Sequence, residues 1–544
     1  MRILSEKTSK LVSLLWERIS YEFCDATSIH GFKHFVGRDK LYLERVFWIV
    51  LPFASLYFCL DFVYSVYEKW ERDPIIISLD KQPSSIYTIP FPAVTICPET
   101  KVKTSELNFT HAFSLLRTGF LNESKDGERI RKVLALLQLC EYNLYERYDH
   151  PLHHNDLSVM LKSMAIPPLE VFNSCIWKGK PINCLKLFKS SLTNMGYCYT
   201  FNSLANSDLL RAEELDPSIN TFNSEINPSD WTLDLGYRNG AGTKAFPRRV
   251  ITGGYYGGLE VSLLVNKSDK DYLCEDSFQG FKVQLHMPNE YTLLMNQFFR
   301  VPVDQQLLVT VAPSVVITDS KVKYYTPDMR HCYYTNERRL RFFRIYTRKN
   351  CEIECLTNHT LSLCGCVRFS MPRPPRAPIC SLRDASCYQE ALSKVLKLEA
   401  MITEGVDRNI SEYCNCLPSC NNVVYDSQVS QADWEWQKRP WIDNSKRQHL
   451  TMDNVHQSKI VIYFREAQFM PLKRNEHIAF SDLVASCGGL LSLFTGVSIL
   501  SLLELIYYCT LRPFSIWRRL KRDESTEDIE AKCECTEKVE PVIQ

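Results

Sequence analysis

Two long apolar runs dominate the pattern of hydrophobic and polar positions along the chain. The first covers residues 46–67, VFWIVLPFASLYFCLDFVYSVY, and carries one charged residue, Asp61. About 20 apolar residues cross a hydrocarbon core of roughly 30 Å, so this run predicts a transmembrane helix over residues 46–68. The run is not a cleavable signal, because 45 mostly polar residues precede it and no small-residue cleavage site follows. Asp61 fits an interfacial position and a vestibule-lining position equally well.

The second run, over residues 480–511, is also long enough to cross a membrane, but small and charged residues interrupt it. It contains Gly488, Gly489 and Gly496, and Glu504 lies near its inner end. A plain lipid anchor has little use for three glycines or a carboxylate. Non-helical backbone and ionisable groups are tolerated in membranes where they face protein or a water-filled path. We therefore predict a pore-lining transmembrane segment, with a plain anchor as the alternative.

Basic residues flank both runs on the same side. Residues 1–45 hold eight Lys and Arg, and a second basic group follows residue 511. Because cytoplasmic flanks carry an excess of Lys and Arg, both termini (1–45 and 512–544) are expected in the cytoplasm and residues 69–479 outside it. The flanking charges are Arg38, Lys40 and Arg45 before the first run, and Arg512, Arg518, Arg519, Lys521 and Arg522 after the second.

Between the two runs the pattern is that of a mixed α+β domain. Apolar residues at helical spacing predict helices over residues 129–140 and 387–401. Runs rich in β-branched and aromatic residues predict strands over 259–265, 281–285, 307–312 and 459–464. The basic and aromatic residues of 337–349 resemble an RNA-binding strand, but a half-buried structural strand is favoured. MPRPPRAP, at 371–378, predicts a proline-stiffened turn.

The cysteines support this division of the chain. Of 22 cysteines, sixteen lie between Cys97 and Cys420, an even number in the proposed oxidising compartment. The C-x3-C and C-x-C spacings also suit zinc, but disulfides are favoured outside the cell, and the lone C-x-C pair near the C-terminus is too small for a closed metal site. Sequons in the same region predict glycosylation at Asn108, Asn122, Asn266, Asn358 and Asn409, and the remaining cysteines are Cys24, Cys59, Cys487, Cys509, Cys533 and Cys535.

Composition excludes several classes of function. The chain of 544 residues has 64 Lys and Arg against 63 Asp and Glu, which argues against a globally basic nucleic-acid binder. With 12% aromatic and 23% charged residues it has a globular composition and not that of a disordered chain. HExxH, G-x-S-x-G, P-loop and G-x-G-x-x-G motifs are absent, so we expect no enzyme activity and no cofactor.

Six short motifs then occur in one order along the chain. They are His30-Gly31, IPFPAVTIC (89–97), GYCYTFN (196–202), VQLHMP (283–288), the cysteine cluster from Cys351 to Cys420, and GGLLSLFTGVSILSLLE (488–504). In this order and spacing the chain resembles the degenerin/epithelial sodium channel superfamily over essentially its whole length. IPFPAVTIC is similar to the first ectodomain strand of that family.

The resemblance implies a fold and a site. It implies two transmembrane helices around a palm, thumb, finger, knuckle and β-ball ectodomain, assembled as a homotrimer or heterotrimer with related subunits in the plasma membrane. The channel would conduct Na⁺ and bind amiloride, with membrane lipid as a further partner and no nucleic acid. Gly496, Val497 and Ser498 would form the selectivity filter, Ala485 the gate position, Gly488, Gly489 and Glu504 further pore-helix positions, and His30 and Gly31 a re-entrant loop supporting the inner pore.

The filter reading also has a physical basis. A cation that leaves water needs replacement oxygens, and backbone carbonyls around a narrow axis supply them. Small residues such as Gly496 and Ser498 allow helices to approach each other, so a simple packing motif remains the alternative. Glu504 could concentrate cations at the cytoplasmic mouth or pair with a basic residue, and a bulkier residue at Ala485 should hold the gate open. A solvated cytoplasmic turn is the alternative for His30-Gly31.

Spacing alone cannot give disulfide connectivity. The resemblance implies seven bridges, and two left-over cysteines suggest an eighth, Cys140–Cys274. We expect the bridges to stiffen the thumb, so that ligand-driven movement reaches the gate. The seven implied pairs are Cys97–Cys198, Cys175–Cys184, Cys332–Cys420, Cys351–Cys416, Cys355–Cys414, Cys364–Cys387 and Cys366–Cys380.

Several departures narrow the resemblance. The C-terminus lacks a PPxY motif, the ectodomain has no clear match to the paired acidic residues of acid-sensing members, and TPDMRH (326–331) stands where those members place a thumb tryptophan. The segment CVRFSMPRPP and the overall spacing are most similar to the insect pickpocket branch, which implies a sensory role in chemical, mechanical, salt or water detection. An ATP-gated type of two-pass channel, and a two-pass ectoenzyme or receptor, are the alternatives.

Overall fold

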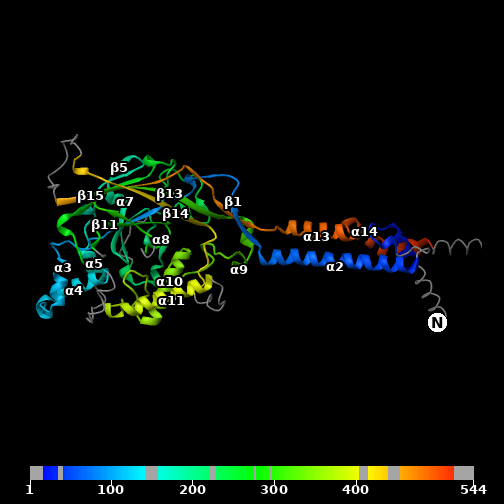
Figure 1. The fold of residues 1–544 in the computed structure, drawn as a ribbon, viewed down its shortest axis with the longest axis horizontal. Helices are drawn as coiled ribbons and strands as arrows, with labels where there is room; N and C mark the ends of the chain where they lie inside the picture. The colour runs from blue at the N-terminus through cyan, green and yellow to red at the C-terminus, as the bar shows by residue number, and fades with distance from the viewer. Residues whose placement is uncertain are drawn as a thin grey trace, which may run out of the picture. The chain divides into compact units, whose positions relative to one another are not determined.

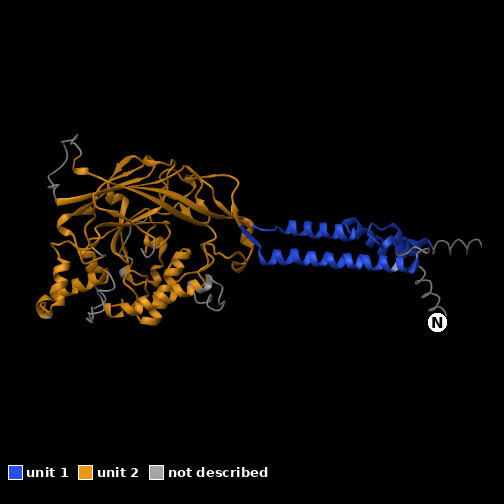
Figure 2. Ribbon diagram, viewed as in Figure 1, with its two compact units in different colours: residues 1–76, 476–544 blue, residues 77–475 orange. Residues whose placement is uncertain are grey.

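The computed structural model describes residues 16–34, 41–140, 157–219, 228–274, 277–293, 297–403, 414–438 and 454–519. The chain folds as two compact units (Figure 2). One combines residues 1–76 with 476–544, and the other is formed by residues 77–475. The apolar runs thus belong to one unit, and nearly all of the predicted ectodomain belongs to the other.

The first apolar run forms one long helix. α2 spans Tyr42–Arg72, 31 residues, and extends beyond both ends of the expected span. At 1.5 Å per residue it is about 46 Å long, more than the hydrocarbon core requires. A helix over residues 16–26 and a 3-10 turn, η1 (Phe32–His34), precede it. The unit therefore brings a short N-terminal segment together with the membrane-crossing helix.

The second apolar run is not one helix but two. α13 (Phe480–Thr495) ends at Gly496, and α14 (Ile499–Ile506) begins after Ser498. A π-helical stretch, η14 (Tyr507–Leu511), follows, and the helix continues to residue 519. Helices long and apolar enough to span a membrane are Tyr42–Arg72 and Ile499–Arg519, with Phe480–Thr495 a shorter apolar helix.

This corrects the expectation that three glycines interrupt the second run. Gly488 and Gly489 lie inside α13, where the helix continues without a break, and the interruption falls at Gly496 alone. Gly496 has a φ of +72°, a left-handed conformation that ends helices and suits glycine. The other two glycines have helical backbones, so their presence alone does not break the helix.

Two β-sheets organise the larger unit (Figure 1). The eight-stranded sheet has the order β1-β17-β13-β15-β10-β4-β5, with β14 paired to β13, and the five-stranded sheet has the order β12-β11-β3-β7-β6. The first sheet uses β1 (Ile75–Leu79), β4 (Phe172–Trp177), β5 (Lys180–Ile182), β10 (Leu259–Asn266), β13 (Gln305–Thr318), β14 (Asn422–Asp433), β15 (Val455–Phe464) and β17 (Leu472–Glu476). The second uses β3 (Ala93–Pro98), β6 (Phe188–Thr193), β7 (Gly196–Phe201), β11 (Gly280–His286) and β12 (Phe299–Pro302). Two short pairs are β2 (Ser84–Ser85) with β16 (Gln468–Phe469), and β8 (Trp231–Thr232) with β9 (Gly236–Tyr237).

All four strands predicted from the pattern are present, as β10, β11, β13 and β15. IPFPAVTIC contributes β3, but it is not the first strand of the domain, because β1 and β2 precede it. β1 has the sequence IIISL, a β-branched run separated from α2 by only two residues. The sequence pattern did not predict β1 as a separate strand, because its apolar residues follow the apolar helix so closely.

Helices complete the larger unit. α3 (Phe109–Arg117), α4 (Glu123–Leu137) and α5 (Leu157–Met164) share one buried cluster, and α10 (Arg348–Cys364) packs beside α11 (Ala385–Thr403). The two predicted helices are thus confirmed, but α4 starts before the expected residue 129 because Asn122 caps it, and it ends at Leu137 rather than at residue 140. Shorter helices are α6 (Pro168–Val171), α7 (Cys184–Leu187), α8 (Asn206–Leu209) and α9 (Pro327–Arg330), and 3-10 turns are η2 (Ile86–Thr88), η5 (Ala212–Glu214), η6 (Pro217–Ile219), η7 (Tyr255–Gly257), η8 (Lys267–Asp269), η10 (Ser320–Tyr324), η11 (Leu382–Asp384) and η12 (Trp436–Lys438).

The core joins the two sheets through aromatic residues. Phe91 is fully buried, with its ring centroid 5.0 Å from Trp177 of β4 and 5.5 Å from Phe464 of β15. Phe201 of β7 lies 6.1 Å away on the side of the smaller sheet. These edge-on contacts are of the kind that stabilise aromatic clusters beyond their buried area.

Residues 337–349 do not form the expected strand. Residues 337–347 are a series of turns and bends with one isolated bridge at Phe343, and residues 348 and 349 already belong to α10. Phe342 and Phe343 are fully buried, and Arg344 donates from Nε to the carbonyl of Leu210 at 2.9 Å. Arg338 and Arg344 thus bind backbone carbonyls and Arg341 a neighbouring carboxylate, which accounts for basic residues beside buried aromatic ones. The proline-rich turn over 371–378 is present as expected, between Cys366 and Cys380.

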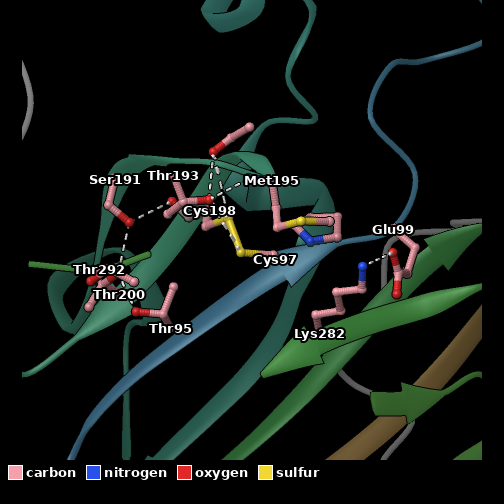
Figure 3. The surroundings of a disulfide bond; sticks show 12 residues. Thr95, Cys97, Glu99, Ser191, Thr193, Met195, Cys198, Thr200, Lys282 and Thr292 are labelled. Atoms are coloured by element: carbon pink, nitrogen blue, oxygen red, sulfur yellow. Dashed lines mark hydrogen bonds and ion pairs between the residues drawn. A yellow bond between two sulfur atoms is a disulfide. The ribbon is translucent and has the colours of Figure 1, made fainter. Parts of the chain in front are cut away.

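Eight disulfides cross-link the larger unit, and they are the eight pairs expected from the sequence. Figure 3 shows one of them, Cys97–Cys198, which joins β3 to β7 beside the hydroxyl of Thr193. Cys24, Cys59, Cys487 and Cys509 are free thiols, all in the smaller unit. Cys533 and Cys535 lie outside the described residues.

Four of the predicted glycosylation asparagines lie on exposed positions. Three of them cap helical turns: Asn108, Asn122 and Asn266 accept backbone N–H bonds at 3.0 to 3.2 Å. Asn358 lies on the exposed face of α10. Asn409 lies outside the described residues.

Candidate ion-conduction site

The break between α13 and α14 is built by hydrogen bonds on both sides. Gly496 donates its N–H to the carbonyl of Ser492 at 2.9 Å, which closes α13. Ser498 has extended backbone angles and caps α14: its hydroxyl accepts the N–H of Ser501 at 3.3 Å, and its own N–H donates to the Ser501 hydroxyl at 3.1 Å. The tripeptide 496–498 is therefore an ordered helix break, a feature that can turn carbonyls away from the helical ladder.

The His-Gly motif braces this break directly. His30 donates its backbone N–H to the carbonyl of Thr495 at 3.0 Å. Two residues earlier, the hydroxyls of Ser28 and Ser501 are 2.8 Å apart, and Ser501 is only 1% exposed. A Cβ atom on Gly496 would lie 3.0 Å from ring carbons of His30 and from the carbonyl oxygen of Ser28. The His-Gly motif thus lies against the helix break within one chain, and its backbone is hydrogen-bonded to the end of α13.

Gly31 holds the other side of the same loop against α2. Its φ is +91°, and a Cβ on it would lie 2.7 Å from Cγ of Pro52. Both features require glycine, because a side chain would be strained and would also overlap the proline ring. Pro52 itself lacks the N–H that would bond to the carbonyl of Trp48 within the helix. The His-Gly loop thus lies between Pro52 of α2 and Gly496, the residue that ends α13.

A second set of contacts ties α2 to the end of α13. The hydroxyl of Ser55 donates to the carbonyl of Phe494 at 2.6 Å. The rings of Phe62 and Phe494 stack with their centroids 5.8 Å apart. The carbonyls of residues 494 and 495, directly before the break, are thus held by α2 and by the His-Gly loop respectively.

The N-terminal helix binds the region beyond the break. Arg512 donates from Nε and Nη2 to one carboxylate oxygen of Glu22, at 2.9 and 2.7 Å. Phe23 packs edge-on against Tyr508, with ring centroids 5.5 Å apart. The sequence pointed to Arg512 only as a flanking charge and did not identify Glu22. The motif is therefore part of a longer N-terminal brace over residues 22–31.

Sequence reasoning missed Ser28, Ser55, Pro52 and Ser501. The S-x-x-S spacing of Ser498 and Ser501 is a capping signal that could have been found. The partners of Ser28 and Ser55 lie 473 and 439 residues away, and Pro52 meets Gly31 across the loop that precedes α2. One sequence gives no sign of such contacts.

The remaining predicted pore positions make few contacts within one chain. Ala485 is exposed, and Cβ atoms built on Gly488 and Gly489 would meet nothing within 4 Å. Oε2 of Glu504 is enclosed and has no hydrogen-bond partner among the described residues. Asp61 is exposed on α2. One subunit thus leaves a face of α13 and a carboxylate oxygen without partners from the described part of the chain.

The larger unit contains a separate buried polar row. Thr95, Thr200 and Ser191 form a chain of hydroxyls at 2.8 to 2.9 Å that crosses the five-stranded sheet (Figure 3). Thr95 also lies 3.0 Å from Nε2 of His286, while Nδ1 of that ring donates to the carbonyl of Met287 at 2.9 Å. Burial lowers the pKa of His286 from 6.5 to about 4, so the ring is neutral at neutral pH.

Comparison with known proteins places these features in a family. The family model described as amiloride-sensitive sodium channel matches residues 23–508, which include both apolar runs and the domain between them. The chain belongs to this family. Pickpocket protein 28 of Drosophila melanogaster is 27% identical over 505 residues, covering 91% of this chain and 79% of the relative. Sodium channel protein Nach of the same species is 23% identical (90% and 86% covered), and acid-sensing ion channel 1A of Danio rerio is 24% identical (89% and 86%).

The family assignment confirms several predictions made from the motifs. The chain is a sodium-channel-type membrane protein with two transmembrane helices and a large, disulfide-rich α+β ectodomain, and it is not an enzyme. The pickpocket and Nach relatives support the insect pickpocket branch.

Proposed function

We propose that the chain is one subunit of a trimeric, sodium-permeable and amiloride-sensitive channel of the plasma membrane, with Gly496, Val497 and Ser498 of each subunit forming the filter. The observation that carries this proposal is the ordered helix break at these three residues, braced by the His30-Gly31 loop. A break that served only helix packing would not require a second segment of chain to hold its carbonyls in place.

More than one copy is needed for such a filter. A ring of oxygens around an axis requires several equivalent breaks, and closed rotational symmetry supplies them from copies of one chain or from related chains. The exposed face of α13 with Ala485, Gly488 and Gly489 is the face proposed to line the pore and its gate. Glu504, whose carboxylate oxygen has no partner from the described residues, is proposed to face the pore or a neighbouring helix.

The proposed topology puts both termini in the cytoplasm. Its support is the set of Lys and Arg residues beside the two apolar runs and the confinement of all eight disulfides to the larger unit. Sodium is the permeant ion, and no cofactor or nucleic acid is proposed. The role is sensory, by similarity to pickpocket proteins, and the disulfide-bonded thumb is proposed to carry movement towards the gate.

The test is electrical recording from cells that express the chain alone or with related subunits. We expect an inward sodium current that amiloride blocks and that ATP does not activate. Replacing external sodium with a large organic cation should abolish the current, and surface labelling provides the control for expression. Surface-expressed protein that gives no sodium current in any combination would refute the proposal, and a current gated by ATP would favour the rival channel type.

A further inference from the structure

A cavity of about 560 Å³ lies behind the filter within the smaller unit. Its floor is the His-Gly loop, with His30 and Gly31, and one wall is the first part of α2, with Trp48 and Leu56. The opposite wall is the end of α13, where Leu491 and Phe494 line it. Thr495 and Val497, on either side of Gly496, also line it.

The lining of this cavity is mostly apolar. Its lining consists mainly of aliphatic and aromatic side chains, and the polar Ser55 and Thr495 already donate to backbone carbonyls at 2.6 Å. Apolar cavities do not hold water, and an empty one would leave its lining without contacts on one side. The volume falls within the range of about 300 to 1,000 Å³ in which proteins bind small ligands. The cavity therefore suits an elongated apolar occupant.

The environment of α2 indicates which apolar molecule could enter the cavity. The cavity is lined by two apolar segments of the membrane unit, and its α2 wall includes Leu51 and Phe53, which are 45% and 67% exposed. These side chains face the medium that surrounds α2, which in a membrane is lipid hydrocarbon. We propose that the cavity binds an acyl chain of a membrane phospholipid, and that this chain supports the filter from behind.

The consequence for conduction rests on the proposed function. An acyl chain in this cavity would contact Val497 on one side and Gly31 on the other, so it would hold the braced loop against the break. Without the acyl chain, the cavity beside the hydrogen bond from His30 to Thr495 would be empty, and no contact from that side would support the loop. Sodium selectivity should therefore depend on the length of the lipid chains, although the head group lies outside the cavity.

A matched pair of substitutions on α2 tests the site. Leu56 lines the cavity and Leu60, one helical turn further along, does not; their exposed fractions are 38% and 56%. The L56W side chain should fill the cavity, whereas L60W adds the same bulk outside it. The full-length protein is reconstituted in nanodiscs of palmitoyl-oleoyl phosphatidylcholine, extracted in mild detergent, and its bound lipid is counted by native mass spectrometry.

We expect tightly retained phospholipid on the wild type and on L60W, and about tenfold less on L56W. In bilayers of shorter acyl chains the sodium-to-potassium permeability ratio should change for the wild type and L60W but not for L56W. Equal lipid retention in the two variants would overturn the proposal. The proposal would also be overturned if the wild type retained no lipid and L56W lost its oligomeric state. A second copy of the chain would then occupy the cavity. If the wild type and L60W retain lipid and L56W does not, but the protein gives no sodium current, the lipid site is supported and only the proposed function is refuted.

Discussion

The replacement Gly496→Ala tests the geometry of the filter most sharply, because two separate features of the structure oppose it. The φ of +72° is a left-handed conformation that costs an L-residue about 1–2 kcal/mol. In addition, the new methyl group would lie 3.0 Å from ring carbons of His30 and from the Ser28 carbonyl oxygen, so the loop would have to shift. A cost of about 1–2 kcal/mol lowers the population of the braced arrangement by a factor of about 5–30.

Amide hydrogen exchange measures this population without relying on conduction. The reporter is the N–H of His30, which donates to Thr495 at 3.0 Å in the braced state. Its exchange should become about 5–30 times faster in Gly496→Ala, since local opening sets the rate. In channels that conduct, the same variant should lose sodium-over-potassium selectivity.

Gly489→Ala is the matched control on the same helix. A Cβ at this position meets nothing within 4 Å, and its φ is not positive. In a helix interior, alanine is favoured over glycine by roughly 0.5–1 kcal/mol, so this variant should leave the His30 amide as protected as in the wild type. Equal acceleration in both variants, or none in Gly496→Ala, would refute the reasoning.

Three further predictions follow from other contacts. Arg512→Gln should cost about 1.5–3 kcal/mol of local stability by removing two charge-assisted bonds to Glu22, seen as faster exchange over residues 16–26, and the exchanged pair Glu22→Arg with Arg512→Glu should restore protection. Because the pKa of His286 is lowered from 6.5 to about 4, the unfolded chain takes up a proton over this interval that the folded chain does not, so stability should fall by about 3 kcal/mol as the pH drops through it. Thermal melts of the full chain across this pH range should show a shallower fall for His286→Gln, and identical pH dependence would contradict the assignment. Ala485→Val should raise the resting current of surface-expressed channels by obstructing closure of the gate, whereas an unchanged or smaller current would argue against a gate at this exposed position.

Local sequence signals predicted much of the fold. The apolar runs predicted both membrane-crossing segments, and runs rich in β-branched and aromatic residues located β10, β11, β13 and β15. The resemblance supplied seven disulfide pairs, and the last two cysteines formed the eighth. These signals are either local in the chain or carried by motifs of fixed order, which is why they could be read without coordinates.

The parts that the sequence did not predict depend on long-range contacts. The segment 337–349 resembles a strand in composition, but Arg338 and Arg344 bind backbone carbonyls of distant segments. The bond between Ser28 and Ser501 joins residues 473 positions apart. The sequence does not distinguish Gly496 from Gly488 and Gly489. Only the contact of Gly496 with the His-Gly loop shows why the helix breaks there.

The central claim is that residues 496–498, braced by the His-Gly loop, select sodium. Its most direct test is the reversal potential of the current under sodium-to-potassium substitution, compared between the wild type, Gly496→Ala and Gly127→Ala at matched surface expression. Gly127 lies in α4 of the larger unit, where a Cβ would meet nothing within 4 Å. We predict a sodium-selective current for the wild type and Gly127→Ala, and a reversal potential for Gly496→Ala shifted towards that of a non-selective cation pore. A sodium-selective current that is unchanged in Gly496→Ala would contradict the claim.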